Sequence, residues 1–131
     1  MKKELEILKR RFEDRDRVLP YSLLDWQSLI NSVQKAAFHR ESETLQHYSL
    51  SLCGEAGELA NLIKKVARRD VDISDIKASA KTEMADVLVY LILLANLMDI
   101  DLADALIHVH TEKILPRLEA GNYYGNQKKE T

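Results

Sequence analysis

The sequence contains only one cysteine, four glycines and two prolines among its 131 residues. A single thiol, Cys53, cannot form an intrachain disulfide, which excludes the class of small domains stapled by disulfides. The scarcity of glycine and proline, beside many Leu, Ala, Glu and Lys residues, favours helices over turn-rich β structure. No segment shows the alternating apolar pattern of a strand. We therefore predict an all-α fold.

Long apolar runs and a large net charge are also absent. The longest apolar run, residues 87–95, falls far short of the about 20 residues that cross a bilayer. The charged start, MKKE, lacks the apolar core of a signal peptide. A formal net charge of −2 gives no basis for a nucleic-acid-binding surface. We expect a cytoplasmic protein that binds neither membranes nor nucleic acids.

Hydrophobic periodicity predicts one domain, residues 1–131, built as a bundle of four to five helices. The predicted helices cover about residues 2–17, 22–39, 44–67, 75–98 and 102–120. Ser22 and Asp25 have the spacing of a capping box for the second helix, and Ser74 or Asp75 can cap the fourth. Asp101 can cap the fifth helix, which should end before Gly121. The polar residues 122–131 are expected to form a flexible tail.

The fourth predicted helix is apolar nearly all round. Between Val87 and Met98, Asn96 is the one strongly polar residue. Such a helix must be covered on every side, and a small bundle leaves one flank of each helix in water. We therefore expect a homo-oligomer, either a dimer or a tetramer. The alternative is a central helix that is wrapped by its own four neighbours.

Two pairs of acidic residues lie on the apolar faces of the third and fourth helices. At about 100° per residue, Glu55 falls inside the apolar stripe of its helix and Glu58 lies at the edge of that stripe. Glu83 and Asp86 share a strip with Tyr90 on the next helix. Helices joined by a short loop run antiparallel, so the two pairs can meet across the interface. Four carboxylates in one place repel each other unless cations neutralise them.

The ligand chemistry of this cluster points to a hard divalent cation. Oxygen ligands alone suit Mg²⁺, with Mn²⁺ as a substitute, rather than Zn²⁺. Neither pair has the Glu-x-x-His spacing of di-iron bundles. Because Mg²⁺ prefers to keep waters and to take phosphate oxygens from a substrate, a polyphosphate substrate is expected. The sequence has no Gly-rich phosphate loop and no nucleophile elbow.

The two acidic segments resemble the MazG-like nucleoside triphosphate pyrophosphohydrolases of the all-α pyrophosphatase superfamily. LSLCGEAGELANLIKK, residues 50–65, is similar to the first acid motif of that family, and EMADVLVYLILLANLMDIDL, residues 83–102, is similar to the second. Lys113, Arg117 and Gly121 keep the spacing of a basic C-terminal signature. His110 departs from it, since many members carry Asn there. The resemblance covers about residues 44–121, and residues 1–43 match nothing specific.

The resemblance implies a Mg²⁺-dependent hydrolase that converts a (deoxy)nucleoside triphosphate to the monophosphate and pyrophosphate, in a nucleotide-pool-cleaning role. It implies that subunits pair and share active sites. The four acids, Glu55, Glu58, Glu83 and Asp86, would hold the metal, and Glu55 or Glu58 would also orient or deprotonate the attacking water. Five residues are candidates to contact the nucleobase or the phosphates of the substrate: Lys65, Tyr90, His110, Lys113 and Arg117.

Two alternatives stay open at the level of sequence. A phosphoribosyl-ATP pyrophosphohydrolase of the same superfamily would share the four acids. A non-catalytic helical interaction module would instead use them in a salt-bridge network, and basic partners should then lie on the facing stripes. Lys65 is the main candidate for such a partner, which counts against this alternative.

Overall fold

The structure is a computed structural model that describes residues 2–37 and 45–121. The helices follow in the order α1 (Lys2–Glu13), α2 (Arg15–Val18), α3 (Leu23–Ala37), α4 (Leu45–Ala67), α5 (Ile73–Leu97), α6 (Leu102–Val109), the π-helical turn η1 (His110–Ile114) and α7 (Leu115–Glu119). No described residue lies in a strand, so the all-α prediction is confirmed. None of the helices in these two segments is long and apolar enough to cross a membrane.

The N-terminal helices differ in one respect from the prediction. The expected helix over residues 2–17 is broken at Asp14, which has a non-helical ψ of 78°. Aspartate favours such breaks because its side chain competes for nearby backbone groups. Beyond the break, α2 ends on the buried Val18. The predicted capping box is present, since the Asp25 N–H donates to the Ser22 hydroxyl at 3.1 Å and the Ser22 N–H donates to the Asp25 carboxylate at 2.8 Å.

Helices α4 and α5 form a long antiparallel hairpin, and their shared interface is the largest in the structure. Helix α5 begins earlier than predicted, because Asp72 rather than Ser74 or Asp75 is its N-cap. The Asp72 N–H donates to the Asp75 carboxylate at 2.8 Å, so Asp75 takes the third helical position of a capping box. The predicted end of the second helix, the start of the third at Thr44 and the tail 122–131 lie outside the described residues.

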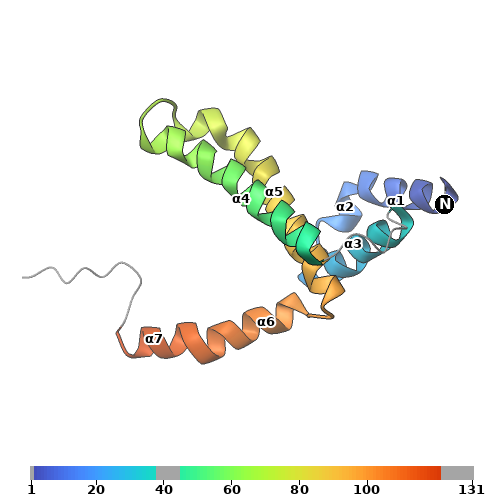
Figure 1. The fold of residues 1–131 in the computed structure, drawn as a ribbon. Helices are drawn as coiled ribbons and strands as arrows, with labels where there is room; N and C mark the ends of the chain where they lie inside the picture. Colours follow the sequence, from blue (N-terminus) through green and yellow to red (C-terminus); the bar gives the residue numbers. More distant parts are fainter. Residues whose placement is uncertain (1, 38–44, 122–131) are drawn as a thin grey trace, which may run out of the picture.

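The last three elements, residues 102–119, form one continuous rod that we call the arm (Figure 1). Its predicted cap is present: the Asp101 carboxylate accepts from the N–H groups of Ala103 and Asp104, at 2.9 and 3.1 Å. The arm ends before Gly121, as expected. The π turn was not predicted. Pro116 explains it, because proline lacks an N–H and its ring clashes with the carbonyl four residues before it in a regular α-helix.

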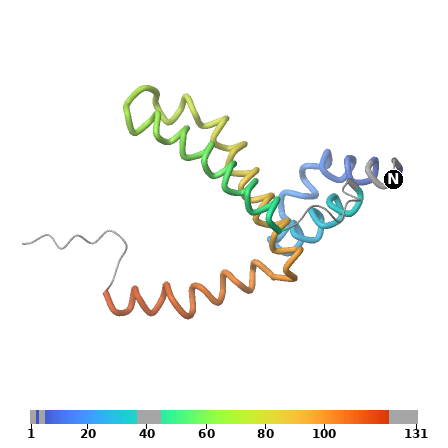
Figure 2. Tube along the Cα trace, in the orientation of Figure 1, coloured from blue at the N-terminus to red at the C-terminus, as the bar shows by residue number. Residues whose placement is uncertain are grey.

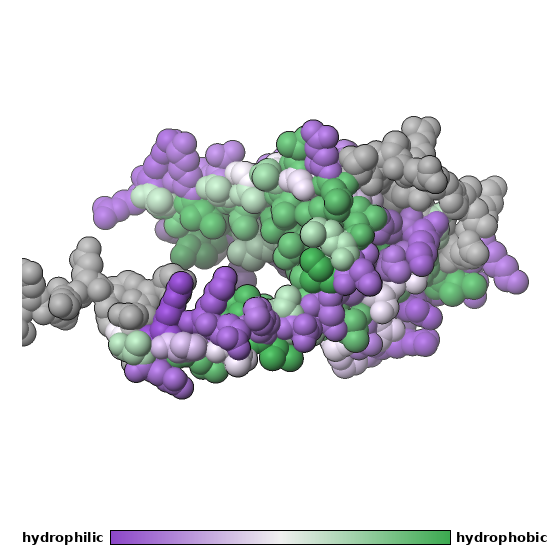
Figure 3. Space-filling model, turned by 60° about the horizontal axis from the view of Figure 1, so that its bottom comes forward, coloured by the Kyte–Doolittle hydropathy of each residue, from purple (hydrophilic) through white to green (hydrophobic). Residues whose placement is uncertain are grey.

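The hairpin and the arm extend from a common base, formed by α1, α2 and α3 with the ends of α4 and α5 that meet them (Figures 1 and 2). Most of the buried apolar residues lie at this base: Val18, Leu29, Ala36, Tyr48, Ile92, Leu93 and Ala95. Further along, α5 is not wrapped by its own neighbours, since Leu88 is 47% exposed and Met84 is 54% exposed. Figure 3 shows apolar side chains gathered on the face of the hairpin that is turned toward the arm.

Candidate metal centre

Three of the four predicted metal ligands meet across the hairpin. Glu55 and Glu58 come from α4 and Glu83 from α5, and one carboxylate oxygen of each lies within 4.8 Å of the other two. Glu55 and Glu83 are half-buried, whereas Glu58 is exposed. The cause is the helical period: i, i+3 spacing places Glu55 and Glu58 on neighbouring positions of the face that packs against α5. We call these three residues the acid triad.

Asp86 lies outside the acid triad but close to it. It follows Glu83 by one turn of α5, is half-buried, and its charge raises the pKa of Glu83. The predicted set of four therefore divides into three clustered carboxylates and one neighbour. In that arrangement Asp86 can bind the same cation directly, or it can accept a hydrogen bond from a water molecule that the cation binds.

The electrostatics of the acid triad are those of a site that lacks a positive charge. Burial is the largest cause that raises the pKa of the Glu83 carboxyl, followed by the charges of Glu58, Glu55 and Asp86 and a side-chain hydrogen bond with Glu55. No ion pair joins any of these acids to a lysine or arginine within residues 2–37 and 45–121. The basic partners that a structural salt-bridge network requires are thus missing from the described part of the chain.

The donor set fits a hard divalent cation. All three ligand groups of the acid triad are carboxylates, the ligands that Mg²⁺ and Mn²⁺ prefer. Oxygens on opposite sides of Mg²⁺ lie about 4.2 Å apart, twice the usual Mg–O distance. The oxygens of the acid triad are within 4.8 Å of one another, which is close to the largest separation that ligands of one such cation would have.

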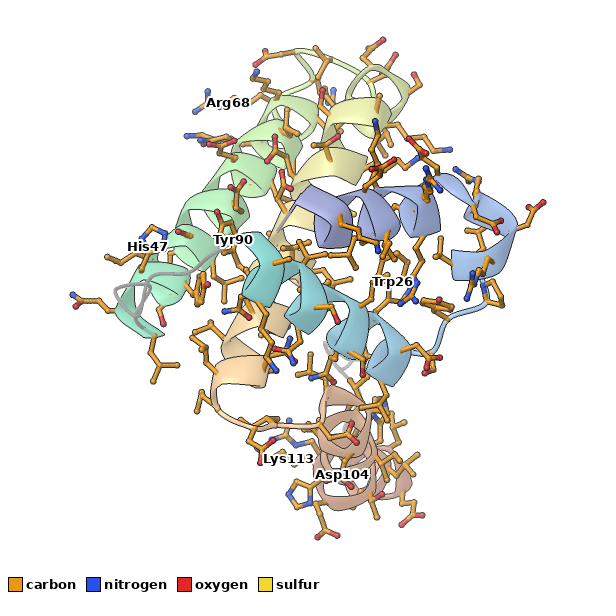
Figure 4. The ribbon with its side chains drawn as sticks, turned by 90° about the vertical axis from the view of Figure 1, so that its right-hand side faces the viewer. Trp26, His47, Arg68, Tyr90, Asp104 and Lys113 are labelled. Carbon is orange, nitrogen blue, oxygen red and sulfur yellow. The ribbon has the colours of Figure 1, made fainter. Side chains whose placement is uncertain are left out.

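Two aromatic rings pack together across the hairpin, between the acids and the common base from which the hairpin and the arm extend. Tyr90 follows Asp86 by one turn, is half-buried, and packs against Tyr48 with the ring centroids 6.3 Å apart (Figure 4). Tyr48 is only 2% exposed, and its hydroxyl accepts a hydrogen bond of 2.9 Å from the Gln34 side chain. The Tyr90 ring, which was predicted to stack on a nucleobase, therefore packs against the buried ring of Tyr48.

The predicted substrate-binding cations are divided between the hairpin and the arm. Lys65 lies on α4 two turns beyond Glu58 and is exposed. Lys113 and Arg117 are exposed residues of the arm, which leaves the base in another direction than the hairpin (Figures 1 and 4). His110 begins the π turn, and its Nδ1 lies 2.7 Å from the Leu106 carbonyl oxygen. Within one chain, Lys65 and Tyr90 thus lie on the hairpin that carries the acids, whereas the other three candidates lie on the arm.

Sequence reasoning missed one buried polar residue. Gln27 of α3 is 5% exposed and bonds to the turn between α5 and α6. A glutamine among the apolar residues of the base, together with Asn96 in the apolar run of α5, was the available signal.

The comparisons agree with the geometry of the hairpin. A family model described as the MazG nucleotide pyrophosphohydrolase domain matches residues 43–119, which include both acid pairs and the whole arm. The comparison with curated proteins found no match, and neither did the comparison with solved structures.

Proposed function

This chain belongs to the MazG nucleotide pyrophosphohydrolase family, and we propose that it converts a (deoxy)nucleoside triphosphate to the monophosphate and pyrophosphate in cytoplasmic nucleotide-pool cleaning. Members of the family act on phosphoric anhydrides and generally depend on a divalent metal. The observation that carries the proposal is the acid triad, which combines three close carboxylates with no paired lysine or arginine in the described chain. Such a site favours a cation and, through it, a polyphosphate.

The proposed roles follow from position. Glu55, Glu58, Glu83 and Asp86 hold Mg²⁺, or Mn²⁺ in its place. The metal when bound would neutralise phosphate charge and acidify a water ligand. Glu58 is the exposed member of the acid triad and can take the proton of the attacking water, with Glu55 beside it as a second acceptor. The bond between the α- and β-phosphates breaks, and the water oxygen stays on the phosphorus that is attacked.

The cations of the arm enter the site from a second copy of the chain. His110, Lys113 and Arg117 lie on a rod that leaves the hairpin of its own chain (Figure 1), yet the basic signature suits the charge of a departing pyrophosphate. The arm also carries an apolar stripe, in which Leu106, Val109 and Leu118 are exposed and Leu102 and Ile114 are half-buried. Its residues follow at steps of four, three, five and four: Leu102, Leu106, Val109, Ile114 and Leu118.

The step of five in this stripe coincides with the π turn. A π turn closes i to i+5 hydrogen bonds, here from the Leu115 N–H to the His110 carbonyl. It therefore keeps Ile114 and Leu118 in line with Val109, where a regular helix would rotate them away. A straight apolar stripe is what packing on another helix requires. With the exposed apolar face of α5, it supports a homodimer or homotetramer of single-domain chains.

The test is pyrophosphate release with each of the common NTPs and dNTPs, in Mg²⁺ and again in EDTA. We expect monophosphate and pyrophosphate in equal amounts with at least one substrate, and no turnover in EDTA. If phosphoribosyl-ATP were the one substrate turned over, the chain would instead be a phosphoribosyl-ATP pyrophosphohydrolase. Binding of nucleotide without any hydrolysis in Mg²⁺ or Mn²⁺ would contradict the proposal.

A further inference from the structure

Gln27 is the one buried polar side chain of the described residues, and it is fully used in hydrogen bonds. Its Nε2 donates to the carbonyl of Ile100 at 2.9 Å and to the Asn96 side chain at 3.4 Å. Its Oε1 accepts from the N–H of Leu102 at 2.9 Å. The Asn96 side chain returns a bond of 3.1 Å to the Gln27 carbonyl. We call these four bonds the Gln27 clamp.

The Gln27 clamp holds the short turn that joins the hairpin to the arm. Ile100 and Leu102 flank the cap residue Asp101. The Gln27 side chain therefore bonds both to the end of the turn and to the first residue of α6. The chain reverses there through Asp99, whose φ of 55° lies in the left-handed region that few non-glycine residues adopt. Local helix propensity does not fix the direction of such a turn. Local backbone bonds close the end of α5, among them one of 2.8 Å from the Ile100 N–H to the Ala95 carbonyl, and the side chain of Gln27 ties this turn to α3.

The direction of this turn determines where the distal end of the arm lies. Lys113 follows Leu102 by eleven residues, which is about 16 Å along a helix at 1.5 Å per residue. A rotation of about 10° at the turn therefore moves Lys113 by about 3 Å, on the same geometry. A cavity of about 240 Å³ beside the clamp, lined by Leu24, Asn31, Asp99 and others, leaves room for the turn to shift.

From this geometry we infer that Gln27 is a positioning residue for catalysis: it sets the angle of the arm and thereby the place of Lys113 and Arg117 in the completed site. Gln27 touches neither acid nor substrate and acts only through those cations. The inference rests on the proposed function, since it requires that the cations of the arm contact the phosphates. A misplacement on the order of 1 Å can lower a rate by about a hundredfold, so a loosened clamp is expected to be visible in kinetics.

The test is a double-mutant cycle of Gln27→Met and Lys113→Ala, which separates positioning from general loss of stability. Methionine keeps the length of the side chain and removes its amide. We expect Gln27→Met to lower kcat/KM by about tenfold or more, while the affinity for Mn²⁺ without nucleotide stays at the wild-type value. In the Lys113→Ala background the same substitution should have a smaller effect, because one of the two cations that it displaces is already gone.

Gln34→Met is the matched control. Gln34 is also a glutamine of α3, and its substitution also removes a hydrogen bond, the one to Tyr48. That bond does not involve the turn. Its effect should add to that of Lys113→Ala. If Gln27→Met does not fold, as judged by circular dichroism, Gln27→Glu keeps the acceptor for Leu102 and enters the same cycle.

Three outcomes overturn the inference. Additive effects of Gln27→Met and Lys113→Ala would mean that Gln27 acts on the fold rather than through the arm, and so would a parallel loss of Mn²⁺ affinity. Failure of the proposed function has a different signature, because wild type would then release no pyrophosphate. If Lys113→Ala left the activity of the enzyme unchanged, Lys113 would have no role in the site, and Gln27 could not position it for catalysis.

Discussion

Glu55 and Glu83 lie on different helices, and a carboxylate oxygen of each lies within 4.8 Å of the other across the α4–α5 interface. Burial raises the pKa of the Glu83 carboxyl most, and the charges of Glu58, Glu55 and Asp86 raise it further. In the absence of a cation, the charge of Glu83 is therefore disfavoured at the position where the proposed function places a metal.

Glu83→Gln and Glu55→Gln should each reduce turnover by at least about a hundredfold, as expected when a preorganised charged group is lost from an active site. Each change removes a ligand charge and keeps the shape of the side chain, so far-UV circular dichroism should remain that of wild type. Glu6→Gln is the control, because it removes an exposed carboxylate whose partner is Arg10 on the same helix. Full activity in both triad variants would exclude these acids from the site.

The raised pKa of Glu83 predicts a pH-dependent stability of the metal-free protein. A carboxyl group whose pKa is higher in the folded than in the unfolded state destabilises the fold at pH values above that pKa, and the deficit disappears as the pH falls through it. Glu83→Gln should therefore melt above wild type at pH 7 in EDTA. The two melting temperatures should converge toward pH 4. A constant difference across this range would show that Glu83 does not titrate as described.

Much of the local structure could be predicted because it depends on residues close together in sequence. The capping box of Ser22 and Asp25 is an example, as is the periodicity that puts Glu55 and Glu83 on facing stripes. The N-cap of α5 was predicted wrongly as Ser74 or Asp75, since Asp72 takes that position and Asp75 is its partner in the capping box. The place of Cys53 within the first acid motif predicts an inert buried thiol, and this prediction is wrong, since Cys53 is exposed.

The rest depends on contacts between distant parts of the chain. Gln27 meets Ile100 and Leu102 across more than seventy residues, and no periodicity encodes that pairing. The direction of the arm follows from the same contact. For this reason the sequence predicted one site containing Lys65, Lys113 and Arg117, whereas a single chain separates the first from the other two.

Divalent cations should stabilise the folded protein. A ligand that binds only the folded state adds about 2.7 kcal/mol at roughly a hundredfold excess over its Kd, which corresponds to a rise of several degrees in Tm for a domain near this size. The measurement is a melting series in Mg²⁺ and Mn²⁺ at fixed ionic strength, with Na⁺ as compensation. Glu55→Gln should abolish most of the shift. Asp86→Asn should reduce it, since Asp86 stands beside the acid triad, and an unchanged shift in both variants would place the metal elsewhere.

The last prediction concerns the partner copy. Leu106 is 53% exposed on the arm of a single chain, so Leu106→Glu should cost little in the monomer but place a charge in the proposed interface. Loss of one buried leucine, worth about 1.5–3 kcal/mol, weakens dimerisation by at least about tenfold. Light scattering across a concentration series should therefore show wild type as a dimer or tetramer at micromolar concentration and the variant dissociating.

Activity should fall together with assembly, because the arm of the second copy carries the cations that complete the site. Glu112→Ala is the matched control: it is an exposed arm residue of the π turn, it lies off the apolar stripe, and it should leave both assembly and turnover unchanged. At high protein concentration the Leu106→Glu variant should regain activity as it reassociates, which distinguishes a lost partner from a damaged site. If the wild-type protein had the mass of a monomer and full turnover, the site could not be shared between two copies. The arm would then not complete the site of a partner.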